Sequence, residues 1–396
     1  FRGISEMSCG DRKKVFLYSG VRTPIGSFRG SLSTATSVEL GATAAKEAMA
    51  RAGLDPSAIS EVVVGSVLTA GVGQNVGRQV AIAAGVPNNV PACTVNKVCS
   101  SSMKALQLAH SAILLGDSAH SLVVGTESMS RVPFYMQRGE IPYGGTAMVD
   151  GVVKDGLEDA MLHDPMGLCA EKSAKDYGIT REESDAYAIG SYKKAAEAWS
   201  AGKFKDEVIP MSIKGRRGEA VKIEEDEEYK KLIESKVPSL SPVFLKDGNG
   251  TITAANASSL NDGAVAAVIS ASIPHPPLAE IVAFAEASGA PVDFTVIPVD
   301  AVKKLLEKTG LNVEAISLWE VNEAFSVTAL AFIRALGIDG TRVNVKGGAV
   351  ALGHPLGMSG LRVVVSLAHS LQRDQLGIAA ICNGGGEAVA VLIRGC

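Results

Sequence analysis

Short runs of apolar and β-branched residues alternate with longer segments of helical periodicity along most of the chain. Residues 15–18, 61–64 and 122–124 predict buried strands. Residues 101–115 predict a helix, and another helix is expected to begin with Ser37 as its N-cap and to end at Gly53. The apolar positions of that helix are Leu40, Ala44, Ala48 and Met49. Such alternation of strands and helices is typical of an α/β protein.

The middle of the chain departs from this alternation. Residues 126–250 are richer in charge, proline and tyrosine, and residues 185–201 predict a long helix among them. The acidic run at 224–228 is predicted to be a solvated loop, because adjacent like charges repel one another and favour water. The segment is therefore interpreted as an insertion rather than as part of a continuous sheet.

The parts that flank this insertion repeat each other. Residues 53–60, Gly-Leu-Asp-Pro-Ser-Ala-Ile-Ser, are echoed by residues 310–317, Gly-Leu-Asn-Val-Glu-Ala-Ile-Ser, at an offset of 257 positions. The same offset places Ser102 on Ser359 and Val124 on Ile381. Two copies of one unit predict a layered α/β/α/β/α body. Its halves would be residues 14–125 with 251–272 and residues 273–396, around an inserted loop domain at 126–250.

Composition narrows the class of protein. The chain has 396 residues, of which 46% are hydrophobic and 20% charged, with a net charge of −4. It is long enough for two or three domains, and no basic stripe indicates a nucleic-acid partner. No apolar run of about 18 residues occurs, so we expect no membrane insertion. The six cysteines show no C-x-x-C spacing, which argues against a disulfide scaffold and a metal–thiolate site.

Candidate chemistry lies in short stretches at the predicted ends of strands, where α/β proteins bind their ligands. Cys99 precedes the helix predicted at 101–115, whose free N–H groups lower the pKa of a thiol and favour a nucleophile. The alternative is a buried structural cysteine. His354 stands in a rigid turn between Gly353 and Pro355, which favours a functional role.

Cys382 ends a strand that we expect to pair with residues 122–124, and three glycines follow it. Their N–H groups can approach a ligand oxygen and form an oxyanion hole, although a tight turn alone explains the glycines equally well. The repeat places Cys99 and His354 at matching corners of the two halves. The sequence therefore predicts a site that combines cysteine and histidine. A P-loop and a G-x-S-x-G elbow do not occur.

Taken together, these stretches resemble the thiolase family over almost the whole chain from Val15. The motifs that carry the resemblance are residues 22–26, 96–99, 322–325, 347–355 and 382–386. Residues 226–229, 254–258 and 319–322 are similar to the mitochondrial, acetoacetyl-CoA-specific branch of the family. The resemblance implies a reversible condensation of two acetyl-CoA to acetoacetyl-CoA, with coenzyme A as substrate and product and no redox cofactor. A degradative 3-ketoacyl-CoA thiolase for longer chains is the main alternative, and a carrier-protein condensing enzyme and a non-catalytic acyl-CoA binding protein are others.

The resemblance also implies roles for individual residues. Cys99 would accept the acyl group after activation by His354, and Cys382 would take the α-proton of the second acetyl group. Asn322, through a water, and His354 would stabilise the enolate. The N–H groups of Cys99 and Gly384 would hold the tetrahedral oxyanion.

Further positions match the ligand sites of the family. The residues implied for coenzyme A are Tyr192, Lys231, Leu232, Lys236 and Ser258. The residues implied for the acyl pocket are Pro165, Met166 and Phe325. A potassium ion would be bound by the hydroxyl of Tyr192 and by the carbonyls of Ala254, Ala255, Ala257 and Val350. Lys231 and Lys236 are interpreted alternatively as ordinary surface charges.

Three residues depart from the family pattern: Ser102 replaces a usual glycine, Pro165 a usual histidine, and Glu387 a usual small or apolar residue. Pro165 is expected to give the acyl pocket an apolar wall that tolerates a 2-methyl branch, unless His163 fills the same space. The resemblance further implies a homodimer or homotetramer in the mitochondrial matrix, with the cytoplasm as alternative. The first 13 residues are interpreted as the end of a transit peptide or as an artificial extension.

Overall fold

The protein is described by a computed structural model that covers residues 13–214, 219–245 and 248–396. Its main sheet has the strand order β12-β13-β14-β11-β1-β10-β5-β3-β4. The strands of the first half are β1 (Val15–Arg22), β2 (Gly26–Ser27), β3 (Glu61–Gly65), β4 (Ala92–Val95), β5 (His120–Ser128) and β10 (Asn261–Ser270). The strands of the second half are β11 (Ala279–Ser288), β12 (Leu318–Val321), β13 (Leu376–Asn383) and β14 (Glu387–Gly395).

The two halves of this sheet are continuous through β1. Residues 15–17 of β1 pair with β11, whereas Phe16 to Arg22 pair with β10 on the other side. The two expected sheets therefore meet along one strand, because each edge leaves backbone groups that need a hydrogen-bond partner.

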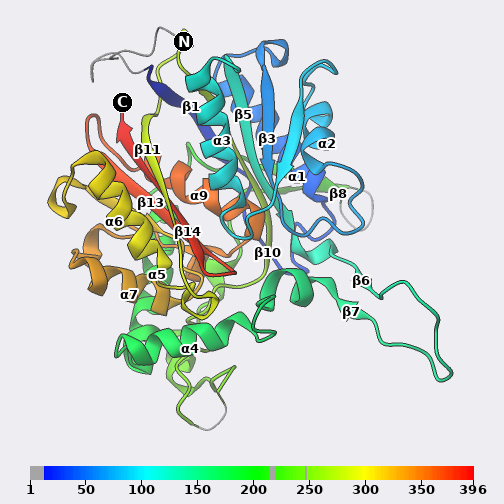
Figure 1. The fold of residues 1–396 in the computed structure, drawn as a ribbon, viewed down its shortest axis with the longest axis vertical. Helices are drawn as coiled ribbons and strands as arrows, with labels where there is room; N and C mark the ends of the chain where they lie inside the picture. Colours follow the sequence, from blue (N-terminus) through cyan, green and yellow to red (C-terminus); the bar gives the residue numbers. More distant parts are fainter. Residues whose placement is uncertain (1–12, 215–218, 246–247) are drawn as a thin grey trace, which may run out of the picture.

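Strands and helices form layers (Figure 1), and successive side chains of a strand pack into different layers. In β5, Leu122 and Val124 pack with the outer helices α1 (Ser37–Arg51) and α2 (Val76–Ala83). Val123 packs between the sheets with the central helices α3 (Ser101–Leu115) and α9 (Leu356–Ala368). In β14, Ala390 and Leu392 pack with α6 (Ile297–Thr309) and α7 (Ser326–Leu336). The predicted α/β/α/β/α order is confirmed.

The internal repeat is also confirmed by the order of elements. The short helix η7 (Val313–Ala315) follows η1 (Pro56–Ala58) at the offset of 257, and β12, α9 and β13 correspond to β3, α3 and β5. The expected pairing of the Cys382 strand with residues 122–124 is wrong. β13 pairs with β12 and β14, whereas β5 pairs with β10 and β3, because corresponding strands lie in different halves of the sheet.

The ends of the helices follow local chemistry. The N-cap of α1 is Thr36 rather than Ser37, because Thr36 and Glu39 form a reciprocal capping box. α3 has the predicted bounds and ends at Gly116, whose φ of 85° is left-handed.

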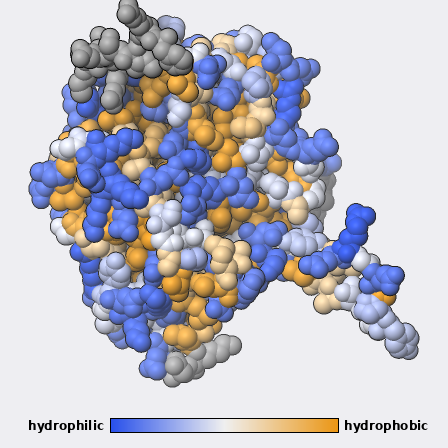
Figure 2. Space-filling view, in the orientation of Figure 1, coloured by the Kyte–Doolittle hydropathy of each residue, from blue (hydrophilic) through white to orange (hydrophobic). Residues whose placement is uncertain are grey.

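The inserted segment has two parts that differ in shape. Its first part includes a narrow arm around β6 (Phe134–Tyr135) and β7 (Val149–Asp150), which projects from the body (Figures 1 and 2). The second part is compact and contains η3 (Val153–Leu157), α4 (Met166–Asp176), α5 (Arg181–Ser200), β8 (Met211–Lys214), β9 (Ala220–Ile223), η4 (Glu228–Lys231) and η5 (Glu234–Ser239). The short helix α8 (Ala349–Leu352) packs on α5.

The acidic run at 224–228 is only partly the solvated loop that its charge predicts, because Glu224 and Glu225 are exposed whereas Asp226 and Glu228 are buried. The Asp226 carboxylate is fully buried and accepts hydrogen bonds from Arg22 at 2.7 and 2.9 Å. Glu227 accepts from the backbone of Ser27 at 2.5 Å. The run anchors the insertion because buried guanidinium and N–H groups replace water around its carboxylates. Over the described ranges, no helix has the length and apolar character needed to cross a membrane.

Candidate active site

Cys99 lies on the loop that leads into α3, and its residue is 6% exposed. The preceding Val98 has a φ of 47°, which is rare for a β-branched residue, and its N–H donates to Asn96 Oδ1 at 2.9 Å. Burial raises the pKa of the Cys99 thiol to about 12, although the N–H groups of Gly384 and of Cys99 itself bond to the sulfur and oppose this. The expected lowering of this pKa by the helix is wrong, so Cys99 needs a base.

His354 lies in the turn before α9 and supplies an unprotonated nitrogen. Its Nδ1 is 2.6 Å from Ser359 Oγ, and the Ser359 hydroxyl donates to the Pro355 carbonyl at 2.9 Å. Ser359 therefore accepts from Nδ1–H, and Nε2 carries no proton. Burial, aided by the charge of Arg362, lowers the pKa of His354 to about 3. Nε2 is buried without a protein partner among the described residues, which leaves it available as a base.

Cys382 ends β13 and is fully buried. Burial, and secondarily the charge of a Cys99 thiolate, raises its pKa well above the usual range. The two sulfurs are therefore close enough for a negative charge on Cys99 to raise the pKa of Cys382. Gly384, two residues further, directs its backbone N–H at Cys99. The structure thus brings Cys99, Cys382 and Gly384 together although they come from different halves of the chain.

Asn322 follows β12 and is fully buried. Its Oδ1 lies 3.5 Å from a guanidinium nitrogen of Arg362, which is paired with Glu320 at 3.0 Å. The Asn322 Nδ2 has no hydrogen-bond partner in the described part of the chain. A buried amide donor without a partner is costly, so it is a ready donor for a bound water or a substrate oxygen.

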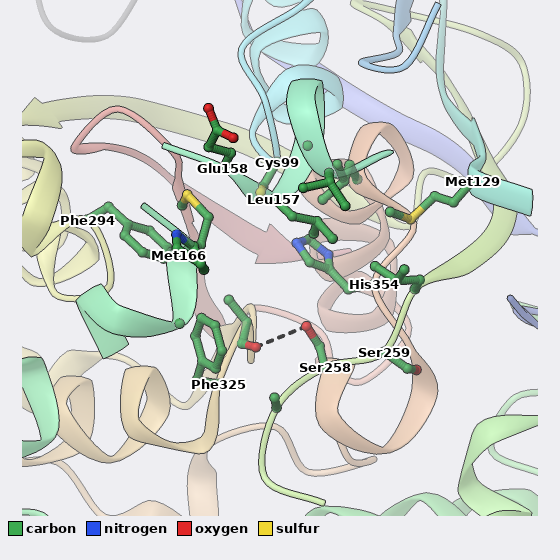
Figure 3. Close-up of a pocket in the computed structure, with 18 of the residues that line it drawn as sticks. Cys99, Met129, Leu157, Glu158, Met166, Ser258, Ser259, Phe294, Phe325 and His354 are labelled. Carbon is green, nitrogen blue, oxygen red and sulfur yellow. Dashed lines mark hydrogen bonds between the residues drawn. The ribbon is translucent and has the colours of Figure 1, made fainter. Parts of the chain in front are cut away.

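A cavity of about 380 Å³ opens over Cys99 and His354, whereas Cys382, Gly384 and Asn322 do not line it (Figure 3). Cys99 and His354 face it with the predicted Pro165, Met166, Phe325 and Ser258. Its remaining wall is largely apolar and includes Leu157, Phe244, Phe294 and Leu356. A reactive acyl group can lie there among apolar side chains, with polar groups gathered at the sulfur. His163 reaches the rim, but its side chain is 72% exposed and lies 3.6 Å from Glu158.

Of the five residues proposed for coenzyme A, only Ser258 lines the cavity. The Ser258 hydroxyl donates to the Ala324 carbonyl at 2.9 Å. Lys231 is half-exposed and pairs with Glu228 at 3.1 Å and with the hydroxyl of Ser27. Lys236 is exposed on η5, and Leu232 is half-buried. The two lysines therefore lie at the surface, outside the cavity.

Two of the residues proposed for potassium, Tyr192 and Val350, lie near buried carboxylates. Burial and the carboxylates of Glu228 and Glu323 raise the pKa of Tyr192 to about 12. The N–H of Val350 donates to Glu323 at 3.1 Å, and Ala257 lines the cavity and forms a bridge with Phe325. No group of three or more metal-binding side chains occurs within residues 13–214, 219–245 and 248–396. A cation here would therefore depend on backbone carbonyls and one hydroxyl, which suits a large monovalent ion such as potassium. The carbonyls that the family resemblance implies for such an ion are those of Ala254, Ala255, Ala257 and Val350.

Sequence reasoning missed two groups that support the site. Ser359 orients His354, as described above. Glu127 is fully buried and accepts hydrogen bonds from Val67 at 3.0 Å, Leu68 at 3.1 Å and Gly357 at 2.9 Å. It thereby ties the start of α9 to the loop after β3. A glutamate three residues after the apolar strand predicted at 122–124 was the available signal.

A buried cysteine with two N–H donors, a neutral histidine, a second cysteine and an apolar cavity define an enzyme that transfers acyl groups through a thiol. Sequence models of the thiolase N-terminal and C-terminal domains match residues 15–272 and 275–395. The chain belongs to the thiolase family, and as a member it is an acyltransferase.

Curated relatives match the sequence of this chain over most of their length. Mitochondrial acetyl-CoA acetyltransferases are 50% identical over 385 residues in Rattus norvegicus and 49% over 387 in Homo sapiens. These matches cover 96% of this chain and 91% and 90% of the relatives. A thiolase from Ascaris suum, solved in complex with coenzyme A, is 55% identical with a TM-score of 0.94, covering 97% of this chain and all of that one. An acetyl-CoA acetyltransferase from Syntrophomonas wolfei is 35% identical with a TM-score of 0.92, covering 98% and 100%.

Proposed function

We propose that the chain is an acetyl-CoA C-acetyltransferase, which condenses two acetyl-CoA to acetoacetyl-CoA and coenzyme A and catalyses the reverse thiolysis. The observation that carries this proposal is the unprotonated Nε2 of His354, which has no partner among the described residues and lies in the same cavity as Cys99. The names of the mitochondrial relatives support the choice of acetyl-CoA.

In the first half-reaction, His354 Nε2 takes the proton of the Cys99 thiol. The thiolate attacks the thioester carbonyl of acetyl-CoA, and the N–H groups of Cys99 and Gly384 stabilise the oxyanion. The tetrahedral intermediate collapses to acetyl-Cys99, and the departing coenzyme A thiolate takes the proton of the Cys382 thiol, which leaves Cys382 as a thiolate and His354 protonated on Nε2. A base is needed because the pKa of buried Cys99 is about 12.

In the second half-reaction, Cys382 as thiolate takes a proton from the methyl group of a second acetyl-CoA. The enolate oxygen is stabilised by His354 and, through a water, by the Nδ2 of Asn322, which has no partner in the described ranges. The enolate carbon then attacks acetyl-Cys99, forms the new carbon–carbon bond and releases the Cys99 thiolate, which takes back the proton of His354 Nε2. Two thiols are required because one is covalently occupied while the other moves a proton.

The direct test is mass spectrometry after incubation with acetyl-CoA. We expect an acetyl adduct on Cys99 of the wild type and none in Cys99→Ser. Absence of the adduct would indicate binding without chemistry. Preference for a longer 3-ketoacyl-CoA over acetoacetyl-CoA in steady-state kinetics would instead indicate the degradative alternative.

The proposal extends to ligands. Tyr192, Leu232 and Ser258 would contact coenzyme A, with Lys231 and Lys236 near its phosphates. The carboxylates of Glu228 and Glu323 favour a cation near Tyr192, where potassium would organise the loop that carries Ser258. Thiolysis rates in potassium and in sodium buffers test the ion, because equal rates would argue against it.

We also propose the mitochondrial matrix as location, on the strength of the relatives' names, and a homodimer or homotetramer as assembly. The exposed arm supports the formation of an oligomer, because apolar side chains along it are exposed to solvent. These side chains are Phe134, Met136, Ile141, Tyr143 and Met148. Light scattering at micromolar concentration tests the assembly, and a monomer would contradict it.

A further inference from the structure

Glu387 begins β14, directly after the glycine turn that carries Gly384. Its Oε2 lies 2.8 Å from Nζ of Lys97, two residues before Cys99. The same Nζ lies 3.3 Å from Glu286 on β11, and the Lys97 side chain is 16% exposed. The lysine end of the pair is shielded from solvent, whereas the Glu387 side chain is 37% exposed, so solvent screens this ion pair in part. Through this ion pair, Glu387 ties the glycine turn to the nucleophile loop.

A second link joins the same two loops. The Ser100 hydroxyl donates to Oδ1 of Asn383 at 2.8 Å, and Asn383 is the cross-strand partner of Glu387 in the β13–β14 register. The glycine turn is therefore bracketed by two residues that both reach the loop of Cys99. Gly385 and Gly386 inside the turn have φ values of 87° and 80°, so the turn itself is conformationally permissive and needs such anchors.

The nucleophile loop also needs restraint. Val98, between Lys97 and Cys99, has a left-handed φ of 47°, which persists only where surrounding contacts impose it. A small relaxation of this loop would move the Cys99 sulfur away from the Gly384 N–H. We propose that Lys97 and Glu387 act as a positioning pair, which holds the Cys99 loop against the glycine turn so that both N–H groups converge on the reacting sulfur and acyl oxygen. Its kinetic consequence rests on the function proposed above.

The test compares Glu387→Ala, Glu387→Gln and Glu280→Ala with the wild type. The glutamine substitution keeps the length of the side chain and one hydrogen-bond acceptor for Lys97. Glu280→Ala is the matched control, because it removes an ion pair to Arg394, at 3.2 Å, between the same strands β11 and β14 at their far end. We expect Glu387→Ala to lower kcat about tenfold with KM for acetyl-CoA changed less than about twofold, since misplacing catalytic groups costs rate rather than binding. Glu387→Gln should recover most of this loss.

A second readout does not need turnover. Alkylation of Cys99 by iodoacetamide, followed by mass spectrometry at pH 7 to 9, reports the thiolate that the Gly384 N–H stabilises. We expect Glu387→Ala to slow alkylation by about threefold or more and Glu280→Ala to leave it unchanged. Equal alkylation rates in Glu387→Ala and Glu280→Ala would contradict the proposal that Lys97 and Glu387 position Cys99. If the wild type forms no acetyl adduct while alkylation still depends on Glu387, the acetyltransferase proposal fails and the positioning pair stands. Lys97→Met tests the same contact from the other side, should Glu387→Ala fold poorly.

Discussion

The hydroxyl of Ser359 joins His354 Nδ1, at 2.6 Å, to the Pro355 carbonyl, at 2.9 Å. One hydroxyl proton can serve only one of these acceptors at a time. While Ser359 donates to Pro355, the imidazole proton stays on Nδ1 and Nε2 is a base. Because Nδ1 keeps this proton when Nε2 takes another from Cys99, the ring becomes an imidazolium that can donate from Nε2 to an enolate. Its low pKa makes this imidazolium a strong acid, which returns the proton to the Cys99 thiolate once that thiolate is released.

Ser359→Ala should therefore lower kcat/KM about 10- to 100-fold, because it removes the control of the tautomer and leaves a buried N–H without a partner. Ser359→Thr keeps the hydroxyl and is the matched control, for which we expect a small effect. Steady-state kinetics of acetoacetyl-CoA thiolysis give the measurement. A kcat/KM for Ser359→Ala within about threefold of wild type would show that the hydroxyl does not control His354.

Substitutions of the two cysteines should impair different half-reactions. Cys382→Ser should still form acetyl-Cys99 but lose exchange of the acetyl-CoA methyl protons with deuterium by about 10²- to 10⁴-fold, the usual contribution of a positioned base. Mass spectrometry and NMR measure the two activities. Cys99→Ser should lose acylation, since a serine hydroxyl is a weaker nucleophile. Failure of Cys382→Ser to become acetylated would contradict this division of roles.

The sequence predicted elements whose determinants are local. The helix at 101–115 has the predicted bounds because its apolar positions and Gly116 lie within it or next to it. The burial of Asp226 within the acidic run was not predicted because its partner, Arg22, is 204 positions away. The pKa of Cys99 was mispredicted for the same reason, since burial by tertiary packing outweighs the adjacent helix end. The cysteines and the histidine of the site could be predicted from the sequence. The roles of Ser359 and Glu127 and the Lys97–Glu387 contact could be recognised only in the folded structure.

Glu127 predicts a pH dependence of stability. Burial raises its pKa to about 7, although three backbone N–H groups oppose this. A carboxyl group with a raised pKa in the folded state stabilises the fold below its unfolded pKa, and this contribution is lost as pH rises through about 7. Wild type should therefore lose free energy of unfolding between pH 5 and 8, and Glu127→Gln should lose less, by a difference on the order of 3 kcal/mol at most.

Urea denaturation at both pH values measures this difference. Glu171→Gln is a useful control, because Glu171 is also buried and also accepts two backbone N–H bonds, from Thr251 and Ile252. Parallel pH dependences of wild type and Glu127→Gln would contradict the assignment to Glu127.

The last prediction concerns the acyl pocket. Pro165 lines the cavity beside Met166, and His163 does not take the place of the usual histidine, because its exposed side chain turns toward Glu158. The wall near the acyl group is therefore fixed and apolar, and the enzyme should accept 2-methylacetoacetyl-CoA as well as acetoacetyl-CoA. Burial of one methyl group is worth about 1 kcal/mol, or several-fold in specificity. Pro165→His should reduce kcat/KM for the methylated substrate by that factor relative to the unbranched one. His163→Ala is the control and should leave the ratio unchanged. Rejection of the methylated substrate by the wild type, or a ratio unaffected by Pro165→His, would show that Pro165 does not set this preference.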